Sequence, residues 1–145
     1  MALKNYTTEV PASKTVSEIH LMLANHGARK IMFDYSTDGK TAAIIFSVLT
    51  PAGERGIKLP ANTARVQEVL MRQKSNPKIK GTIDASPEQA ERVAWRIVKD
   101  WLASQLAILE TEMVDMEQLF MPYIVTRSGQ TLYDAYLGGA LMLPE

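Results

Sequence analysis

The sequence predicts a single α+β domain in which a three-stranded antiparallel meander packs against several helices. Three observations lead to this prediction. Residues 30–59 hold three short runs of strand-like pattern, separated by turns of hairpin length. Apolar residues at helical spacing precede and follow these runs, and one helical stretch extends over about 87–112. The length, 145 residues, suits one domain with one packed core.

The first helix is predicted from a capping box. Thr15 and Glu18 have the spacing at which a hydroxyl accepts from a first-turn amide and a carboxylate reaches back to the cap. We therefore expect residues 1–14 to form a flexible N-terminal arm and the helix to begin at Thr15. Its end is expected at His26-Gly27, where glycine can adopt the left-handed conformation that terminates helices.

The period then changes to two, which predicts the strands. Residues 30–35 alternate apolar and polar side chains, residues 41–50 are apolar on both faces, and residues 55–59 alternate again. The turn between the first two contains Asp38-Gly39, a strong hairpin signal. Because the connections are short, consecutive strands should pair antiparallel with the second in the centre.

The second half of the chain is predicted to be helical, with one long irregular segment. A helix should follow Asn62, and residues 74–85 have no period but contain Pro, Gly and three lysines, which predicts an exposed basic loop. Ser86-Pro87 supplies an N-cap and a first-turn proline for the long helix. This helix is longer than a three-stranded sheet, so we expect it to contact other helices or another subunit. Short helices should follow, and residues 138–145 form an apolar tail that either docks or frays.

Charge is divided along the chain although the net charge is zero. Residues 29–80 carry ten bases and four acids, a net charge of +6, whereas residues 81–145 carry four bases and ten acids, a net charge of −6. This separation is typical of a chain with a nucleic-acid-facing part, or of one whose acidic part pairs with its basic part. The lack of cysteine, of a signal peptide and of an apolar run of membrane-spanning length leads us to expect a cytoplasmic protein without disulfides.

Seven basic residues are the candidate nucleic-acid-binding site. Four belong to the second helix and the basic loop, and three recur at i, i+4 and i+7 on the long helix. Glu88 and Asp100 have the spacing to pair with two of the helix residues and so to neutralise part of this face. The seven are Arg72, Lys74, Lys78, Lys80, Arg92, Arg96 and Lys99.

Catalytic chemistry is not indicated. Asp34 and Asp38 could begin a two-metal nuclease site, but such a site needs three or four converging carboxylates, and Asp-Gly is better explained as a hairpin turn. His20 and His26, six apart, do not share one helical face as zinc ligands would. We expect no enzyme activity, metal or cofactor, with a metal-dependent nuclease kept as an alternative.

The segments KIMFDYSTDGKTAAIIFSVLTPAGERGIKLPAN and EQAERVAWRIVKDWLASQLAILETEMVDMEQLFMPYIV resemble small proteins of bacteriophages, prophages and related mobile elements. That family has no assigned activity, so the resemblance implies an origin but transfers no functional residue. The order of elements, a meander followed by a long helix, is also similar to that of the phage single-strand-annealing recombinases.

These observations together lead to two functional hypotheses. The first is a non-enzymatic accessory protein of a phage or mobile element that binds single-stranded or replicating DNA through the basic loop and helix face. The alternative is an accessory factor that binds or inhibits a host or defence protein through apolar contacts. In either case we expect a homo-oligomer.

Overall fold

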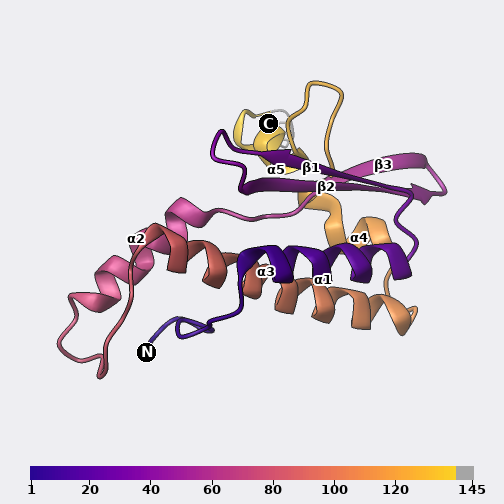
Figure 1. The fold of residues 1–145 in the computed structure, drawn as a ribbon. Helices are drawn as coiled ribbons and strands as arrows, with labels where there is room; N and C mark the ends of the chain where they lie inside the picture. The colour runs from indigo at the N-terminus through magenta and orange to yellow at the C-terminus, as the bar shows by residue number, and fades with distance from the viewer. Residues whose placement is uncertain (140–145) are drawn as a thin grey trace. The chain divides into compact units, whose positions relative to one another are not determined.

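The protein has the predicted α+β fold, seen in a computed structural model that describes residues 1–139 (Figure 1). A three-stranded antiparallel sheet is accompanied by five α-helices and one 3₁₀ helix within this range. The elements in chain order are α1 (Ala12–Asn25), β1 (Lys30–Tyr35), β2 (Thr41–Thr50), β3 (Gly53–Lys58), α2 (Thr63–Lys74), α3 (Pro87–Glu110), α4 (Met116–Phe120), η1 (Met121–Tyr123) and α5 (Leu132–Leu137). No helix in the described range is long and apolar enough to cross a membrane.

The predicted meander is confirmed, with strand order β1-β2-β3. Phe46 pairs with Ile57 and lies two residues from Ile44, so these three residues share one face of the sheet, and all three are buried. Met32 and Ile45 pair on the opposite face. Phe46 meets Phe120 of α4 edge to face, with ring centroids 5.9 Å apart. This geometry is favoured between aromatic rings and anchors α4 on the sheet.

The chain divides into two compact units. The first combines Met1–Leu21 with Ala61–Ser104, and the second combines Met22–Pro60 with the chain from Gln105 onward. In the first unit, Leu70 of α2 and Val93 of α3 are fully buried together with Ile83 of the intervening loop. In the second unit, the core is the covered face of the sheet.

The predicted start of the first helix is wrong. The helix α1 begins at Ala12, and the backbone N–H groups of Lys14 and Thr15 donate to the carbonyl of Pro11. Thr15 is fully buried, so its hydroxyl packs inside the first unit instead of capping the helix. A proline before the first turn starts the helix at no cost because that position needs no N–H donor.

The residues before α1, which we expected to be a flexible arm, are hydrogen-bonded to the helices of the first unit. The N–H of Leu3 donates to Oε1 of Gln73, at 2.9 Å. The side-chain amide of Gln89 donates to the carbonyls of Tyr6 and Thr8, at 2.9 and 3.0 Å. These bonds satisfy backbone groups that have no helix or strand partner.

The later elements match the sequence prediction closely. The long helix α3 ends at Glu110, two residues before the predicted end, and is followed by Glu112 in the left-handed conformation (φ 62°). Capping boxes open both α4, at Asp115, and α5, at Thr131. Of the predicted tail over 138–145, Gly138 caps α5, and residues 140–145 lie outside the described range.

Candidate functional site

The seven predicted basic residues all lie in the first unit, but their surroundings differ. Three residues of α3 are half-buried, and four residues of α2 and the following loop are exposed. The half-buried residues are Arg92, Arg96 and Lys99. The exposed residues, which we call the loop cations, are Arg72, Lys74, Lys78 and Lys80.

Two of the half-buried cations are bound to a carboxylate of α1. Arg96 Nη1 donates to Glu18 Oε2 at 3.0 Å, and the Lys99 ammonium donates to the same oxygen. The bond from Lys99, reinforced by the Arg96 charge, holds the pKa of Glu18 below its usual value. Because Arg96 and Lys99 already share this partner, either residue would have to give up its contact with Glu18 to bind a ligand.

The pairings that we predicted from helical spacing do not form in this way. Arg96 donates to Glu18 instead of to Asp100, which binds Lys4 at 3.3 Å and accepts from the Asn5 amide at 2.9 Å. Sequence reasoning missed Glu18 because it lies 78 positions from Arg96. No local pattern reports a contact at such a separation.

Arg92 is also committed to its own unit. Its Nε donates to Oε1 of Gln89 at 2.8 Å, and Gln89 is 5% exposed. The Arg92 charge adds to a low pKa at Asp84, which arises mainly from the backbone N–H of Ser86 and to a lesser degree from Arg92 and Lys74. All three cations of α3 are therefore engaged by side chains of their own unit.

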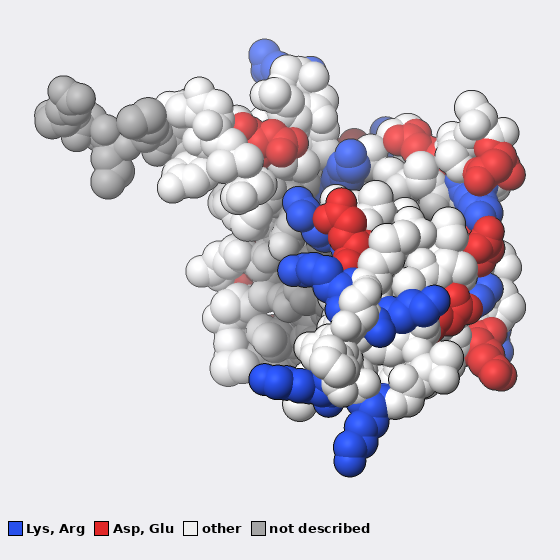
Figure 2. All heavy atoms as spheres, turned by 90° about the vertical axis from the view of Figure 1, so that its left-hand side faces the viewer, with Lys and Arg blue, Asp and Glu red and all other residues white. Residues whose placement is uncertain are grey.

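The loop cations have the opposite character. Each is exposed, and none forms an ion pair with a carboxylate of residues 1–139. Residues 72–84 contain these four bases and one acid, Asp84, so the segment has a net charge of +3. Figure 2 faces the end of the molecule where α2 and this loop lie in Figure 1, and it shows several basic side chains extending into solvent.

Apolar residues between the lysines hold the loop on the first unit. Ile83 is 3% exposed and packs with Leu70, and Ile79 lies partly buried against the same cluster. Asn76 adds a local turn, in which its side-chain oxygen accepts from the N–H of Lys78 at 2.9 Å. An isoleucine every four residues in a polar loop was the signal for this anchoring, and the sequence analysis did not use it. The anchored loop presents its lysines outward.

The basic loop contains positive charges but no aromatic side chains. No aromatic residue lies between 72 and 84, and Tyr6, which packs on the loop's apolar cluster, is partly buried. Stacking of unpaired bases needs exposed aromatic faces, whereas phosphates need only cations and N–H donors. The chemistry of this surface therefore suits a phosphate backbone better than bases.

The acidic and histidine candidates occupy positions explained by the fold. Asp38 accepts hydrogen bonds from the Ser36 hydroxyl and from the N–H of Lys40, at 3.2 Å for the latter, which closes the hairpin turn. His26 ends α1 and binds the carbonyl of Met22 and the carboxylate of Glu110, at 2.7 and 2.8 Å. Among residues 1–139, no three acidic or histidine side chains come close enough together to hold a metal ion.

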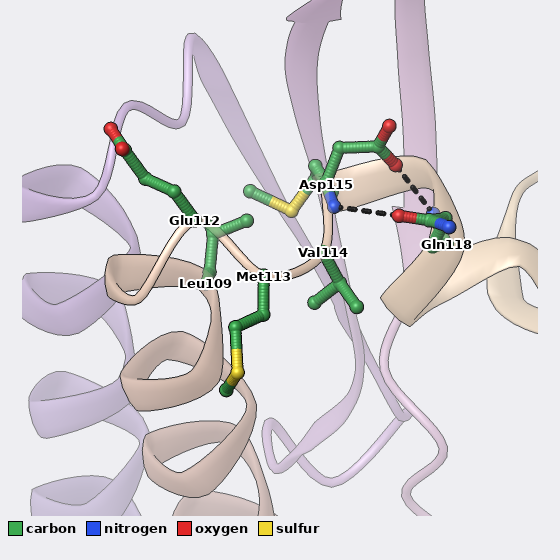
Figure 3. A pocket seen from close by; sticks show the side chains of 7 residues that line it. Leu109, Glu112, Met113, Val114, Asp115 and Gln118 are labelled. Carbon is green, nitrogen blue, oxygen red and sulfur yellow. Dashed lines mark hydrogen bonds between the residues drawn. The ribbon is translucent and has the colours of Figure 1, made fainter.

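A second candidate surface lies at the corner between α3 and α4, in the second unit (Figure 3). It is an open hollow of about 400 Å³ with a mixed wall, in which the apolar residues Leu109, Met113, Val114 and Met116 stand beside Glu112, Asp115 and Gln118. Met113 is 73% exposed and points away from Glu112, as Figure 3 shows. Reciprocal hydrogen bonds between Asp115 and Gln118, both 3.0 Å long, fix the start of α4 beside it.

Comparisons with protein-family models, with curated proteins and with solved structures found no match to this chain.

Proposed function

We propose that this protein is a non-enzymatic accessory protein that binds single-stranded or replicating DNA through the phosphates, using the loop cations. The single observation that supports this function is that four exposed cations lie on an anchored loop without a carboxylate partner among residues 1–139. A cation without a partner can release condensed counterions from a phosphate at no cost in broken ion pairs. The origin in a phage or mobile element remains part of the proposal through the sequence resemblance.

The proposed interface is smaller than the seven residues that the sequence suggested. Arg96 and Lys99 are excluded from it because a phosphate would have to compete with Glu18. Arg92 is excluded because its Nε already donates to Gln89. The remaining four cations give a sequence-independent contact.

Salt dependence tests this proposal quantitatively. Four phosphate contacts predict that log K falls with log salt at a slope of about −2.8 on single strands and −3.6 on duplex DNA. Between about 50 and 200 mM salt, affinity should therefore fall roughly 50-fold on single strands and 150-fold on duplexes. Fluorescence anisotropy with labelled oligonucleotides of both kinds measures these slopes directly.

A matched pair of quadruple variants locates the surface. The first changes Arg72, Lys74, Lys78 and Lys80 to alanine. The control changes Lys14, Lys40, Lys58 and Arg127, which are also exposed, to alanine and alters the net charge by the same amount. We expect the first variant to lose binding and the control to retain most of it. Equal losses would show that only net charge matters, and no binding by the wild type at low salt would refute the function.

The alternative, a protein-binding accessory factor, is favoured by the corner between α3 and α4. Met113 is exposed and lines the hollow together with Leu109 and Val114, and methionine adapts readily to different partners. Replacing Met113 with Lys should leave DNA binding unchanged. Suppose instead that the Met113 variant abolished the effect of the protein in cells and that the quadruple loop variant left this effect unchanged. The alternative would then replace the first proposal.

A further inference from the structure

The two edges of the sheet in the second unit differ in whether a further segment of the chain pairs with them. At the β3 edge, Ile57 bridges Ile124, and the N–H of Val125 donates to the carbonyl of Gly56 at 2.8 Å. At the other edge, β1 pairs with β2 alone within residues 1–139. An edge strand of this kind presents a row of backbone donors and acceptors to another strand.

The devices that usually protect such an edge are few in β1. Its six residues, KIMFDY, contain no proline, and the irregularity in the ladder near Asp34 arises from an extra residue on β2, Ala42. Met32 is 51% exposed in the middle of the strand, on the face opposite to the core. An edge strand that lacks proline and has an exposed apolar residue at its centre can pair with another strand, and its two charged residues, Lys30 and Asp34, restrict the register of that pairing.

The hydrogen-bond pattern restricts how a second strand could pair. The N–H of Leu59 donates to the carbonyl of Ile44, so in the alternating ladder Ile44 bonds to the β3 side and Ile45 bonds to β1. Met32, the partner of Ile45, therefore directs its backbone towards β2, and the odd-numbered residues of β1, such as Ile31, direct theirs outward. An antiparallel copy of β1 must match odd residues with odd residues.

Among the registers that satisfy this rule, one brings opposite charges together. When Met32 faces Met32 of a second copy, Lys30 faces Asp34 twice, once on each side of a two-fold axis. Moving either strand by one step to the next allowed register places Lys30 or Asp34 opposite Met32 instead. Cross-strand pairs of opposite charge stabilise a sheet, and like charges destabilise it. Asp34 is exposed and Lys30 has only a long contact of 3.7 Å, with Glu54.

We propose that two copies of this chain associate through β1, antiparallel and centred on Met32, to form a continuous six-stranded sheet. The pairing is isologous, since the same strand serves both partners, and such two-fold contacts are the commonest in homo-oligomers. This inference is independent of the DNA-binding proposal, because it uses neither the loop cations nor their unit.

Charge reversal tests the register. Lys30→Asp and Asp34→Lys each create two like-charged pairs across the axis, whereas the double variant restores two opposite pairs. Sedimentation equilibrium should show weaker dimers for each single variant, by about 10-fold in Kd, and recovery in the double variant. Lys58→Asp, a reversal on the same face of β3, is the control and should change nothing.

Cysteine cross-linking gives a second, independent measurement, since the chain contains no cysteine. In the proposed register, Met32→Cys faces its own copy in a non-hydrogen-bonded pair, where the Cα atoms lie about 4.5 Å apart, within reach of a disulfide. Mild oxidation should link Met32→Cys into dimers, and Leu49→Cys, which is 65% exposed on β2, should stay monomeric. A wild-type protein that is monomeric at all concentrations, or a dimer unaffected by both reversals and cross-linked equally at both cysteines, would overturn the proposal.

Discussion

Replacing Gln89 with leucine tests how the N-terminal residues are held on the first unit. Gln89 is 5% exposed, and its side chain makes three hydrogen bonds, two donated to carbonyls and one accepted from Arg92 Nε. Leucine has a similar volume, so the change removes the hydrogen bonds and leaves little cavity. The carbonyls of Tyr6 and Thr8 then lose their side-chain donor.

The magnitude follows from these bonds. Two neutral hydrogen bonds contribute about 1 kcal/mol each and the bond to a guanidinium about 1.5–3 kcal/mol. Burial of the leucine side chain returns about 1–2 kcal/mol. The free energy of unfolding should therefore fall by roughly 1.5–4 kcal/mol, which is a large part of the stability of an ordinary domain.

Urea unfolding followed by tryptophan fluorescence measures this change, since Trp95 and Trp101 both belong to the first unit. Gln67→Leu is the control, because Gln67 donates one bond, of 3.2 Å, to the carbonyl of Ala85, and we expect a loss below about 1 kcal/mol. Hydrogen exchange of residues 3–10 should also accelerate in the Gln89 variant alone. A loss no larger than that of the control would refute the role assigned to Gln89.

Two further predictions concern single side chains. Thr15→Val should raise the free energy of unfolding by about 1 kcal/mol, because the buried Thr15 hydroxyl has no hydrogen-bond partner among the described residues and valine has the same shape; an unchanged or lower urea midpoint would contradict this. Hydrogen bonds to Glu110 and to the Met22 carbonyl raise the pKa of His26. Protonated His26 should therefore stabilise the second unit below about pH 6.5, and this contribution should disappear as the pH rises through the raised pKa. Because Glu110 is mostly exposed, the effect should stay below about 1 kcal/mol, and the stability difference between wild type and Glu110→Gln should be larger at acidic than at alkaline pH.

The meander and the long helix could be predicted because their signals are local. Asp38-Gly39 closes a hairpin through contacts among residues 36–40, and the alternation of side chains over 30–35 and 55–59 predicted the two outer strands. Ser86 caps α3 through the N–H of Gln89, three residues away. Each of these interactions joins residues that are close in sequence, so a pattern of a few residues specifies them.

The same reasoning failed at Thr15 for an identifiable reason. A Thr-x-x-Glu pattern is compatible with a helix N-terminus and also with one helical turn whose threonine faces the core. Propensity does not distinguish these cases, because the choice depends on what α1 packs against. Pro11 and the burial of Thr15 place the helix start three residues earlier.

The sequence by itself determined the fold class, the order of the elements and the seven cations from which a binding surface could be built. The tertiary structure decided which of these cations remain exposed, because Glu18 and Gln89 bind the residues of α3, whereas the loop cations form no ion pair with a carboxylate of residues 1–139. The physical reason is that a charged side chain forms an ion pair only with a group that the fold brings within reach. Glu18 and Arg96, 78 positions apart, meet only after α1 and α3 have packed.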